Sequence, residues 1–260
     1  MRILLTGSSK GIGRAIAERL ARSGHALALC GSRPSAELDE AAAACTAAGA
    51  MVKTLTGDLA DPAAPARLVS QAVAVLGGID GVVSNAGISI PGNLAEYPQD
   101  AWDRVFSINV RSGWLLARAA YPHLVAAGGG AFIAVASMSG IEPYPGVGAY
   151  SASKAALIML VRTLALEWAA SGVRVNCVSP GLFLSAMTAP IYADPQKKAA
   201  REALVPMRRI GDPARDIAGL VDFMLSPDAG YITGQNVLAD GGLMGSIHAH
   251  IAGRPRSAGE

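Results

Sequence analysis

Short apolar runs that suit β-strands alternate with longer alanine-rich amphipathic stretches along nearly the whole chain. The runs "ILL", "ALAL", "GVV" and "FIAVA" are apolar at successive positions rather than at every second one. Strands of this kind are expected where helices cover both faces of a sheet. The alternation therefore predicts an α/β fold, in which a doubly wound parallel sheet of about seven strands is flanked by helices in a single domain.

The expected element boundaries carry an error of a few residues. Strands are expected near residues 2–6, 25–30, 51–56, 79–84, 131–137, 173–178 and 235–239. Helices are expected near residues 12–23, 35–48, 62–76, 99–127, 149–171 and 213–225.

The domain is expected to cover residues 1–245, followed by a tail over 246–260. Within the domain, the segment 184–210 has no strand pattern and contains three prolines around short helical pieces. We expect it to form an insertion beside the functional site that could act as a lid.

The 22 basic and 20 acidic side chains nearly cancel, and the basic residues are scattered. This balance argues against nucleic acid or an anionic membrane as partner, and favours small molecules or further subunits. The sequence contains no apolar run of the roughly 18 residues that a membrane span needs, and "MRILLTG" lacks the apolar core of a signal peptide. We expect a cytoplasmic protein.

Neither the cysteines nor the histidines have the spacing of a metal site. The three cysteines are widely separated and are expected to be packing residues: Cys30, Cys45 and Cys177. The four histidines are expected at the surface: His25, His123, His248 and His250. No metal cofactor is therefore expected.

A glycine-rich stretch, "TGSSKGIG" at 6–13, joins the first expected strand to the helical run "RAIAERLARSG". Such a turn lets backbone N–H groups and a helix N-terminus face a pyrophosphate. The alternative is an ordinary tight turn between a strand and a helix. Because the motif opens the first strand–helix unit of an alternating chain, we favour a Rossmann-type dinucleotide site. The spacing TGxxxGxG is one residue longer between the first two glycines than GxGxxG.

Further motifs follow this loop at characteristic intervals. They are Asn85-Ala86-Gly87 after the fourth expected strand, Asn109, Ser137, the pair Tyr150 and Lys154 in "YSASK", and Pro180-Gly181. Their order and spacing resemble those of the short-chain dehydrogenase/reductases of about 250 residues, from Met1 to "ADGG" at 239–242. The chain is similar to 3-oxoacyl-[acyl-carrier-protein] reductases and to sugar, polyol and alcohol dehydrogenases.

The resemblance implies an NAD(P)-dependent oxidoreductase that transfers hydride between a secondary alcohol and a ketone. It implies that Tyr150 is the general acid/base and that Ser137 hydrogen-bonds the reacting oxygen. Lys154 is implied to hold the nicotinamide ribose, and Asn109 to position a water in a proton relay.

Simple electrostatics supports a special role for the pair Tyr150 and Lys154, which share one face if the segment is helical. A cation about 4 Å from the phenol oxygen, at an effective dielectric of about 20, favours the phenolate by on the order of 4 kcal/mol, or about three pKa units. We therefore expect the pKa of Tyr150 to be lowered toward neutrality, where a proton donor is most effective.

The resemblance also implies which residues contact the cofactor and the substrate. The expected cofactor residues are Gly7, Ser9, Lys10, Gly11, Ile12, Gly13, Ser32, Arg33, Asp58, Leu59, Asn85, Ala86, Gly87, Tyr150, Lys154, Pro180, Gly181, Phe183 and Ser185. Asp58 is expected to contact the adenine, with capping of the helix near Pro62 as its other interpretation. The expected substrate residues are Ser137, Met138, Tyr144, Tyr150, Phe183 and Met187.

NADP(H) is expected in preference to NAD(H). A dinucleotide fold selective for NAD usually carries an acidic residue at the end of the second strand. This chain has Gly31-Ser32-Arg33 there, and Lys10 can converge on the same place. Two cations and a hydroxyl suit a 2′-phosphate, unless Glu37 or Asp39 folds back toward them.

The expected substrate is a free small alcohol, ketone, polyol or sugar, and the direction of the reaction stays open. The runner-up is a 3-oxoacyl-[acyl-carrier-protein] reductase, although the runs 126–130 and 169–172 are neutral where basic residues would meet an acidic carrier. A non-catalytic dinucleotide-binding regulatory protein is the alternative from another class. From the resemblance we also expect a homotetramer, assembled through the helices 99–127 and 149–171 and the last strand.

Overall fold

The computed structural model describes residues 1–185 and 188–246, so the expected substrate residue Met187 and the tail beyond Ser246, with His248 and His250, lie outside the described residues. Its sheet has seven parallel strands in the order β3-β2-β1-β4-β5-β6-β7. The strands are β1 (Arg2–Thr6), β2 (Ala26–Gly31), β3 (Val52–Thr56), β4 (Gly81–Ser84), β5 (Gly130–Val135), β6 (Val173–Pro180) and β7 (Asn236–Ala239). The predicted Rossmann-type, doubly wound parallel sheet is confirmed.

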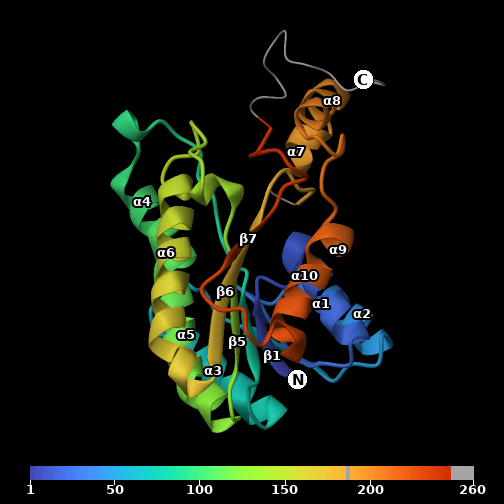
Figure 1. Ribbon diagram of the computed structural model, residues 1–260, viewed down its shortest axis with the longest axis vertical. Coiled ribbons are helices and arrows are strands. Elements are labelled where there is room, and N and C mark those ends of the chain that lie inside the picture. Colours follow the sequence, from blue (N-terminus) through green and yellow to red (C-terminus); the bar gives the residue numbers. More distant parts are fainter. Residues whose placement is uncertain (186–187, 247–260) are drawn as a thin grey trace.

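Helices cover both faces of this sheet. They are α1 (Gly11–Arg22), α2 (Ala36–Ala47), α3 (Ala64–Leu76), α4 (Gln99–Phe106), α5 (Ser112–Ala126), α6 (Tyr150–Trp168), α7 (Ala189–Tyr192), α8 (Pro195–Leu204), α9 (Pro213–Asp216) and α10 (Ala218–Leu225). Figure 1 shows α3, α5 and α6 on one side of the sheet and α1, α2 and α10 on the other.

Strand β1 explains why the strands are apolar at successive positions. Leu4 belongs to the core under α3, α5 and α6, whereas Ile3 and Leu5 belong to the core under α1 and α10. All three side chains are fully buried. Because successive side chains of a strand point to opposite faces, a strand covered on both faces needs apolar residues at every position.

The expected helix 99–127 is interrupted. Helices α4 and α5 are joined by a π-helical turn over Ser107–Arg111, which contains Asn109. A π-helical turn inserts one residue into the α-helical repeat, and such turns are frequent at functional sites. The expected helix 213–225 is likewise divided at Ile217, whose φ of −123° is not helical.

The segment 184–210 contains the helices α7 and α8 and no strand in its described part. Figure 1 shows both helices beyond the carboxyl end of the sheet, on the side opposite α4. Its function as a lid stays a prediction.

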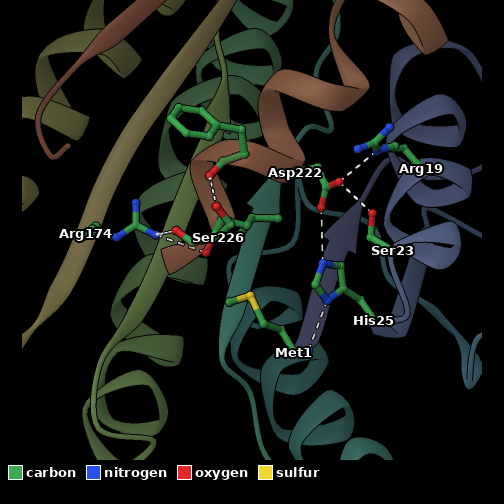
Figure 2. A network of polar contacts seen from close by, with 9 residues as sticks. Met1, Arg19, Ser23, His25, Arg174, Asp222 and Ser226 are labelled. Atoms are coloured by element: carbon green, nitrogen blue, oxygen red, sulfur yellow. Dashed lines mark hydrogen bonds and ion pairs between the residues drawn. The ribbon is translucent and has the colours of Figure 1, made fainter. Parts of the chain in front are cut away.

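The expectation that His25 lies at the surface is wrong, as Figure 2 shows. Its ring is half-buried between the amino group of Met1, at 3.1 Å, and the carboxylate of Asp222, at 3.3 Å. That carboxylate also accepts hydrogen bonds from Arg19 Nε at 2.8 Å and from Ser23 Oγ at 2.7 Å. The network ties α10 to α1 and to the start of β2, at the amino end of the sheet.

Arg174 at the start of β6 holds the C-terminal end of α10, close to Asp222 (Figure 2). Its guanidinium donates to the carbonyl oxygens of Met224 at 2.7 Å and of Leu225 and Ser226 at 3.1 Å. These are carbonyl groups that the end of a helix leaves without intrahelical partners. Burial lowers the pKa of the guanidinium, whose two terminal nitrogens donate to these three carbonyl oxygens.

The three cysteines are free and buried, in agreement with their expected role in packing. Within the described residues, no three His, Cys, Asp or Glu side chains gather in a way that could hold a metal ion. None of the helices described has both the length and the apolar character needed to cross a bilayer. A cytoplasmic location stays a prediction.

Candidate active site

The glycine loop between β1 and α1 depends on residues without side chains. Gly7 and Gly11 have φ values of +65° and +57°, in the left-handed region that other residues rarely adopt. A Cβ atom on Gly13 would lie 2.0 Å from the carbonyl oxygen of Gly7. The loop is therefore folded tightly against the first turn of α1.

The N-terminus of α1 has no side-chain cap. Lys10 occupies the N-cap position with extended backbone, and its ammonium group has no acceptor for the N–H groups of the first helical turn. The first N–H groups of a helix need partners from outside and carry a partial positive charge. This helix start can therefore receive an anion such as a phosphate.

Asn85 braces the loop. Its Nδ2 donates to the carbonyl oxygens of Thr6 at 3.0 Å and Gly7 at 2.9 Å. Thr6 Oγ1 in turn accepts from the backbone N–H groups of Asn85 at 3.1 Å and Ala86 at 3.2 Å. The side-chain amide of Asn85 lines the cleft described next, but its hydrogen bonds are made within the protein.

A cleft of about 660 Å³ lies at the carboxyl ends of the strands. Every expected cofactor residue except Arg33 lines it, as do all the expected substrate residues that the structure describes. Those lining side chains and glycines are Gly7, Ser9, Lys10, Gly11, Ile12, Gly13, Ser32, Asp58, Leu59, Asn85, Ala86, Gly87, Ser137, Met138, Tyr144, Tyr150, Lys154, Pro180, Gly181, Phe183 and Ser185.

Arg33 is exposed and is not part of the cleft lining. It lies near Glu37 in the first turn of α2. Hydrogen bonds with its own backbone and with Ser35 lower the pKa of the Glu37 carboxyl, and the charges of Lys10 and Arg33 lower it further. The carboxyl group of Glu37 thus lies close enough to Lys10 and Arg33 to be influenced by both positive charges.

Asp58 does not cap the following helix. Its Oδ1 accepts from the N–H group of Ala60 at 2.9 Å, whereas Asp61 accepts from Ala63 at 2.9 Å, just before α3. The capping interpretation of Asp58 is therefore wrong, because that helix starts later than expected.

Three side chains come together where β5 ends and α6 begins. Tyr150 is the first residue of α6, and Lys154 follows one turn later. Lys154 is 3% exposed, its Nζ lies 5.7 Å from the centre of the Tyr150 ring, and it donates to the carbonyl oxygen of Val135 at 2.8 Å. Ser137 caps a short 3₁₀ turn, where its Oγ accepts from the N–H group of Ser139 at 3.1 Å.

Asn109 lies behind this group and is absent from the cleft lining. Its Oδ1 accepts from the N–H group of Ile88 at 2.9 Å, and its Nδ2 donates to the carbonyl oxygen of Ile88 at 2.9 Å and to Ser153 Oγ at 3.0 Å. A Cβ on Gly87 would lie 3.3 Å from both Asn109 Oδ1 and Lys154 Nζ. The side chain of Asn109 therefore holds the loop after β4 beside Lys154.

The expected fall in the pKa of Tyr150 is not found. Burial raises the pKa of the phenol, and the hydrogen bond with Ser137 lowers it by less. Burial also lowers the pKa of Lys154 to about 8. The ammonium group points to Val135 and is itself desolvated, so its charge does not offset the burial of the phenol.

Among the lining residues that sequence reasoning missed are Arg104 from α4, and Thr188, Ile191 and Arg201 from the 184–210 segment. Thr188 Oγ1 donates to the carbonyl oxygen of Phe183 at 2.6 Å and accepts from the N–H group of Ser185 at 2.9 Å. Nothing in the local pattern distinguishes these residues from surface positions, because long-range folding alone brings them to the cleft.

A doubly wound sheet whose carboxyl edge carries a glycine loop, an uncapped helix start and a half-buried tyrosine beside a buried lysine defines a dinucleotide-dependent enzyme. Comparison with known proteins gives the family. Residues 7–244 match the family model described as "Enoyl-(Acyl carrier protein) reductase". "Dehydrogenase/reductase SDR family member 4" of Bos taurus is 38% identical over 245 residues, which cover 94% of this chain and 87% of that protein.

Solved structures agree. A candidate short-chain alcohol dehydrogenase from Sinorhizobium meliloti has a TM-score of 0.90 and 36% identity, covering 95% of this chain and 97% of its own. A candidate NAD(P) dependent gluconate 5-dehydrogenase from Beutenbergia cavernae, with bound NADP, has a TM-score of 0.88 and 34% identity, covering 94% and 96%.

The chain belongs to the short-chain dehydrogenase/reductase family. It is an NAD(P)-dependent oxidoreductase that interconverts alcohol and carbonyl groups of small molecules.

Proposed function

We propose that this enzyme interconverts a secondary alcohol and a ketone on a free small molecule, with Tyr150 as the proton donor and acceptor. The observation that carries this proposal is that Tyr150 and Ser137 line the same cleft, with the buried Lys154 one helical turn from Tyr150. Ser137 and Tyr150 together offer two hydroxyl groups to one substrate oxygen.

The raised pKa of Tyr150 leaves the phenol protonated at neutral pH. A protonated phenol can donate to the oxygen of a bound carbonyl group, and Ser137 can share the developing charge. In the opposite direction Tyr150 must first lose its proton, which the ammonium of Lys154 favours once a ligand draws it away from Val135.

The cleft fits a dinucleotide. A Cβ at Gly13 or Gly87 would meet neighbouring atoms, so bare backbone forms the surface on which a cofactor can lie, and the N-terminus of α1 suits its pyrophosphate. The nicotinamide ring, when bound, supplies or accepts the hydride. Lys154 would hold its ribose, and Gly181, Phe183 and Ser185 would lie along its carboxamide side.

We further propose a preference for NADP(H). Lys10 and Ser32 line the cleft beside Gly31, where no acidic residue ends β2. Glu37 opposes this preference, since it shares its surroundings with Lys10 and Arg33. The ratio of kcat/KM for NADP(H) to that for NAD(H) tests the preference, and a ratio below one contradicts it.

We also propose a homo-oligomer in which the outer faces of α5 and α6 are covered. These faces expose Trp114, Met159 and Leu166, of which Leu166 is 83% exposed. Exposed apolar side chains gathered on neighbouring helices are typical of subunit contacts. Light scattering at micromolar concentration tests this, and a monomer mass would refute it.

A 3-oxoacyl-[acyl-carrier-protein] reductase is the second candidate, since the matching family model is described by another reductase of carrier-bound acyl chains. Lys197 and Lys198 of α8 could meet an acidic carrier, but they pair with Asp194 at 3.2 Å and Glu202 at 3.8 Å. A panel assay that follows nicotinamide absorbance with ketones, polyols, aldoses and an acetoacetyl carrier protein separates the two. Efficient reduction of the carrier substrate alone would favour the second candidate.

A further inference from the structure

Arg201 of α8 reaches into the cleft from the 184–210 segment. Its Nη2 donates to the hydroxyl of Tyr144 at 3.3 Å. Its guanidinium also lies over the ring of Tyr192, 5.6 Å from the ring centre. Tyr144 belongs to the expected substrate residues, so Arg201 lies at the substrate end of the cleft.

Its neighbours hold Arg201 in place. Tyr192 of α7 is 9% exposed, and its ring attracts the cation by a cation–π contact. Within residues 1–185 and 188–246, the buried hydroxyl of Tyr192 has no hydrogen-bond partner. Buried hydroxyl groups normally have a hydrogen-bond partner. The hydroxyl of Tyr192 has none among the described contacts.

The charge of Arg201 is not compensated by an acidic side chain. The other cations of α8, Lys197 and Lys198, pair with Asp194 and Glu202. Arg201 has no carboxylate within 4.0 Å in the described part of the chain, and neither has Arg104, which lines the cleft from α4.

The acidic side chain in the described lining lies away from Arg201, at the cofactor end of the cleft. Asp58 is the acidic residue among the lining residues described, and it lies with Gly57 and Leu59 after β3, on the side of the glycine loop. The substrate end thus combines Arg104, Lys154 and Arg201 without a carboxylate in its lining. A cleft lined by one sign of charge concentrates ligands of the opposite sign.

We propose that Arg201, with Arg104 on the opposite wall, binds a carboxylate of the substrate, so that the enzyme acts on small hydroxy acids and oxo acids. This inference rests on the proposed function, because it places the reacting carbon at Tyr150 and Ser137 and the carboxylate at Arg201. A guanidinium matches a carboxylate with two parallel N–H···O hydrogen bonds. The substrate is oriented by its charge at one end and by its reacting oxygen at the other.

The test compares a hydroxy acid with its primary amide, which has the same carbon skeleton and no charge. We expect wild-type kcat/KM to favour the acid by roughly tenfold to a hundredfold, the range of a charge-assisted hydrogen bond. Arg201→Gln should remove this preference, Arg201→Lys should keep part of it, and the matched control Lys198→Gln on the same helix should keep it fully. The Kd of NADP(H), measured without substrate, should stay unchanged in all three variants.

Several results would overturn the proposal. Equal turnover of acid and amide by the wild type would overturn it and leave the proposed function intact. An Arg201→Gln variant that slows both substrates equally, or that weakens NADP(H) binding, would have the same meaning. A phosphate monoester that outperforms the carboxylate would show that the site is built for phosphate. Absence of turnover with every member of the panel, charged or neutral, would instead refute the proposed function. If Arg201→Gln has a lowered Tm, Arg104→Gln takes its place in the same comparison.

Discussion

Lys154 Nζ donates a hydrogen bond to the carbonyl oxygen of Val135 at 2.8 Å, so the ammonium group is anchored to the end of β5. The side chain is almost fully buried, and burial lowers its pKa to about 8. The enzyme thus keeps a poorly solvated lysine next to Tyr150. This arrangement costs stability and places a cation beside the ring of Tyr150.

Lys154→Met should therefore stabilise the protein without ligand while abolishing turnover. The folded-state pKa lies below the unfolded value, so the folded state carries the full penalty of a buried charge below pH 8, and the penalty fades as the pH rises toward about 10.4. Allowing for the lost hydrogen bond to Val135, we expect a gain on the order of 2 kcal/mol at pH 7.

Denaturant unfolding of both proteins at pH 7 and pH 10 measures this difference. The advantage of Lys154→Met should shrink at the higher pH. A variant that is less stable than wild type at pH 7 would show that Lys154 is well solvated or well paired.

Gly13→Ala should destroy cofactor binding, because the added Cβ would lie 2.0 Å from the carbonyl oxygen of Gly7 and force the loop open. The matched control is Gly219→Ala in α10, where a Cβ meets nothing within 4 Å. This control should gain roughly 0.5–1 kcal/mol, since alanine is the better helix former. Titration with NADPH followed by fluorescence measures binding, and near-normal affinity in Gly13→Ala would contradict the close packing of the loop.

Asp222→Ala should destabilise the fold without changing turnover. It removes the acceptor for Arg19, Ser23 and His25 at the amino end of the sheet (Figure 2). Donors that lose such an acceptor typically cost about 1–3 kcal/mol. Asp228→Ala, at an exposed position a few residues later, is the control and should change little. Equal Tm values for the two variants would mean that the network contributes nothing to stability.

The layers of the fold were predictable because they depend on local patterns. Leu4 and its neighbours in β1 are apolar at every position, which already implies helices on both faces of the sheet. The face shared by Tyr150 and Lys154 was predictable as well, since four residues make about one helical turn. Glycine positions such as Gly13 were predictable because a strand-to-helix turn around a phosphate excludes side chains.

Directions of side chains and distant partners were not predictable. The spacing of Tyr150 and Lys154 does not reveal that the ammonium turns to Val135, at the end of strand β5. The π-helical turn over Ser107–Arg111, which contains Asn109, was not among the expected elements. Arg201 reaches the cleft only because α8 folds over the end of the sheet. There it contacts Tyr144, which lies 57 residues earlier in the sequence.

The most direct test of the proposed chemistry is turnover of Tyr150→Phe, which removes the phenol hydroxyl and leaves the ring in place. We expect kcat to fall by at least about 10²-fold on a substrate established for the wild type, the lower end of the range for general acid–base catalysis, with the Kd of NADP(H) nearly unchanged. Near-wild-type kcat in Tyr150→Phe would contradict the assignment of Tyr150 as the proton donor.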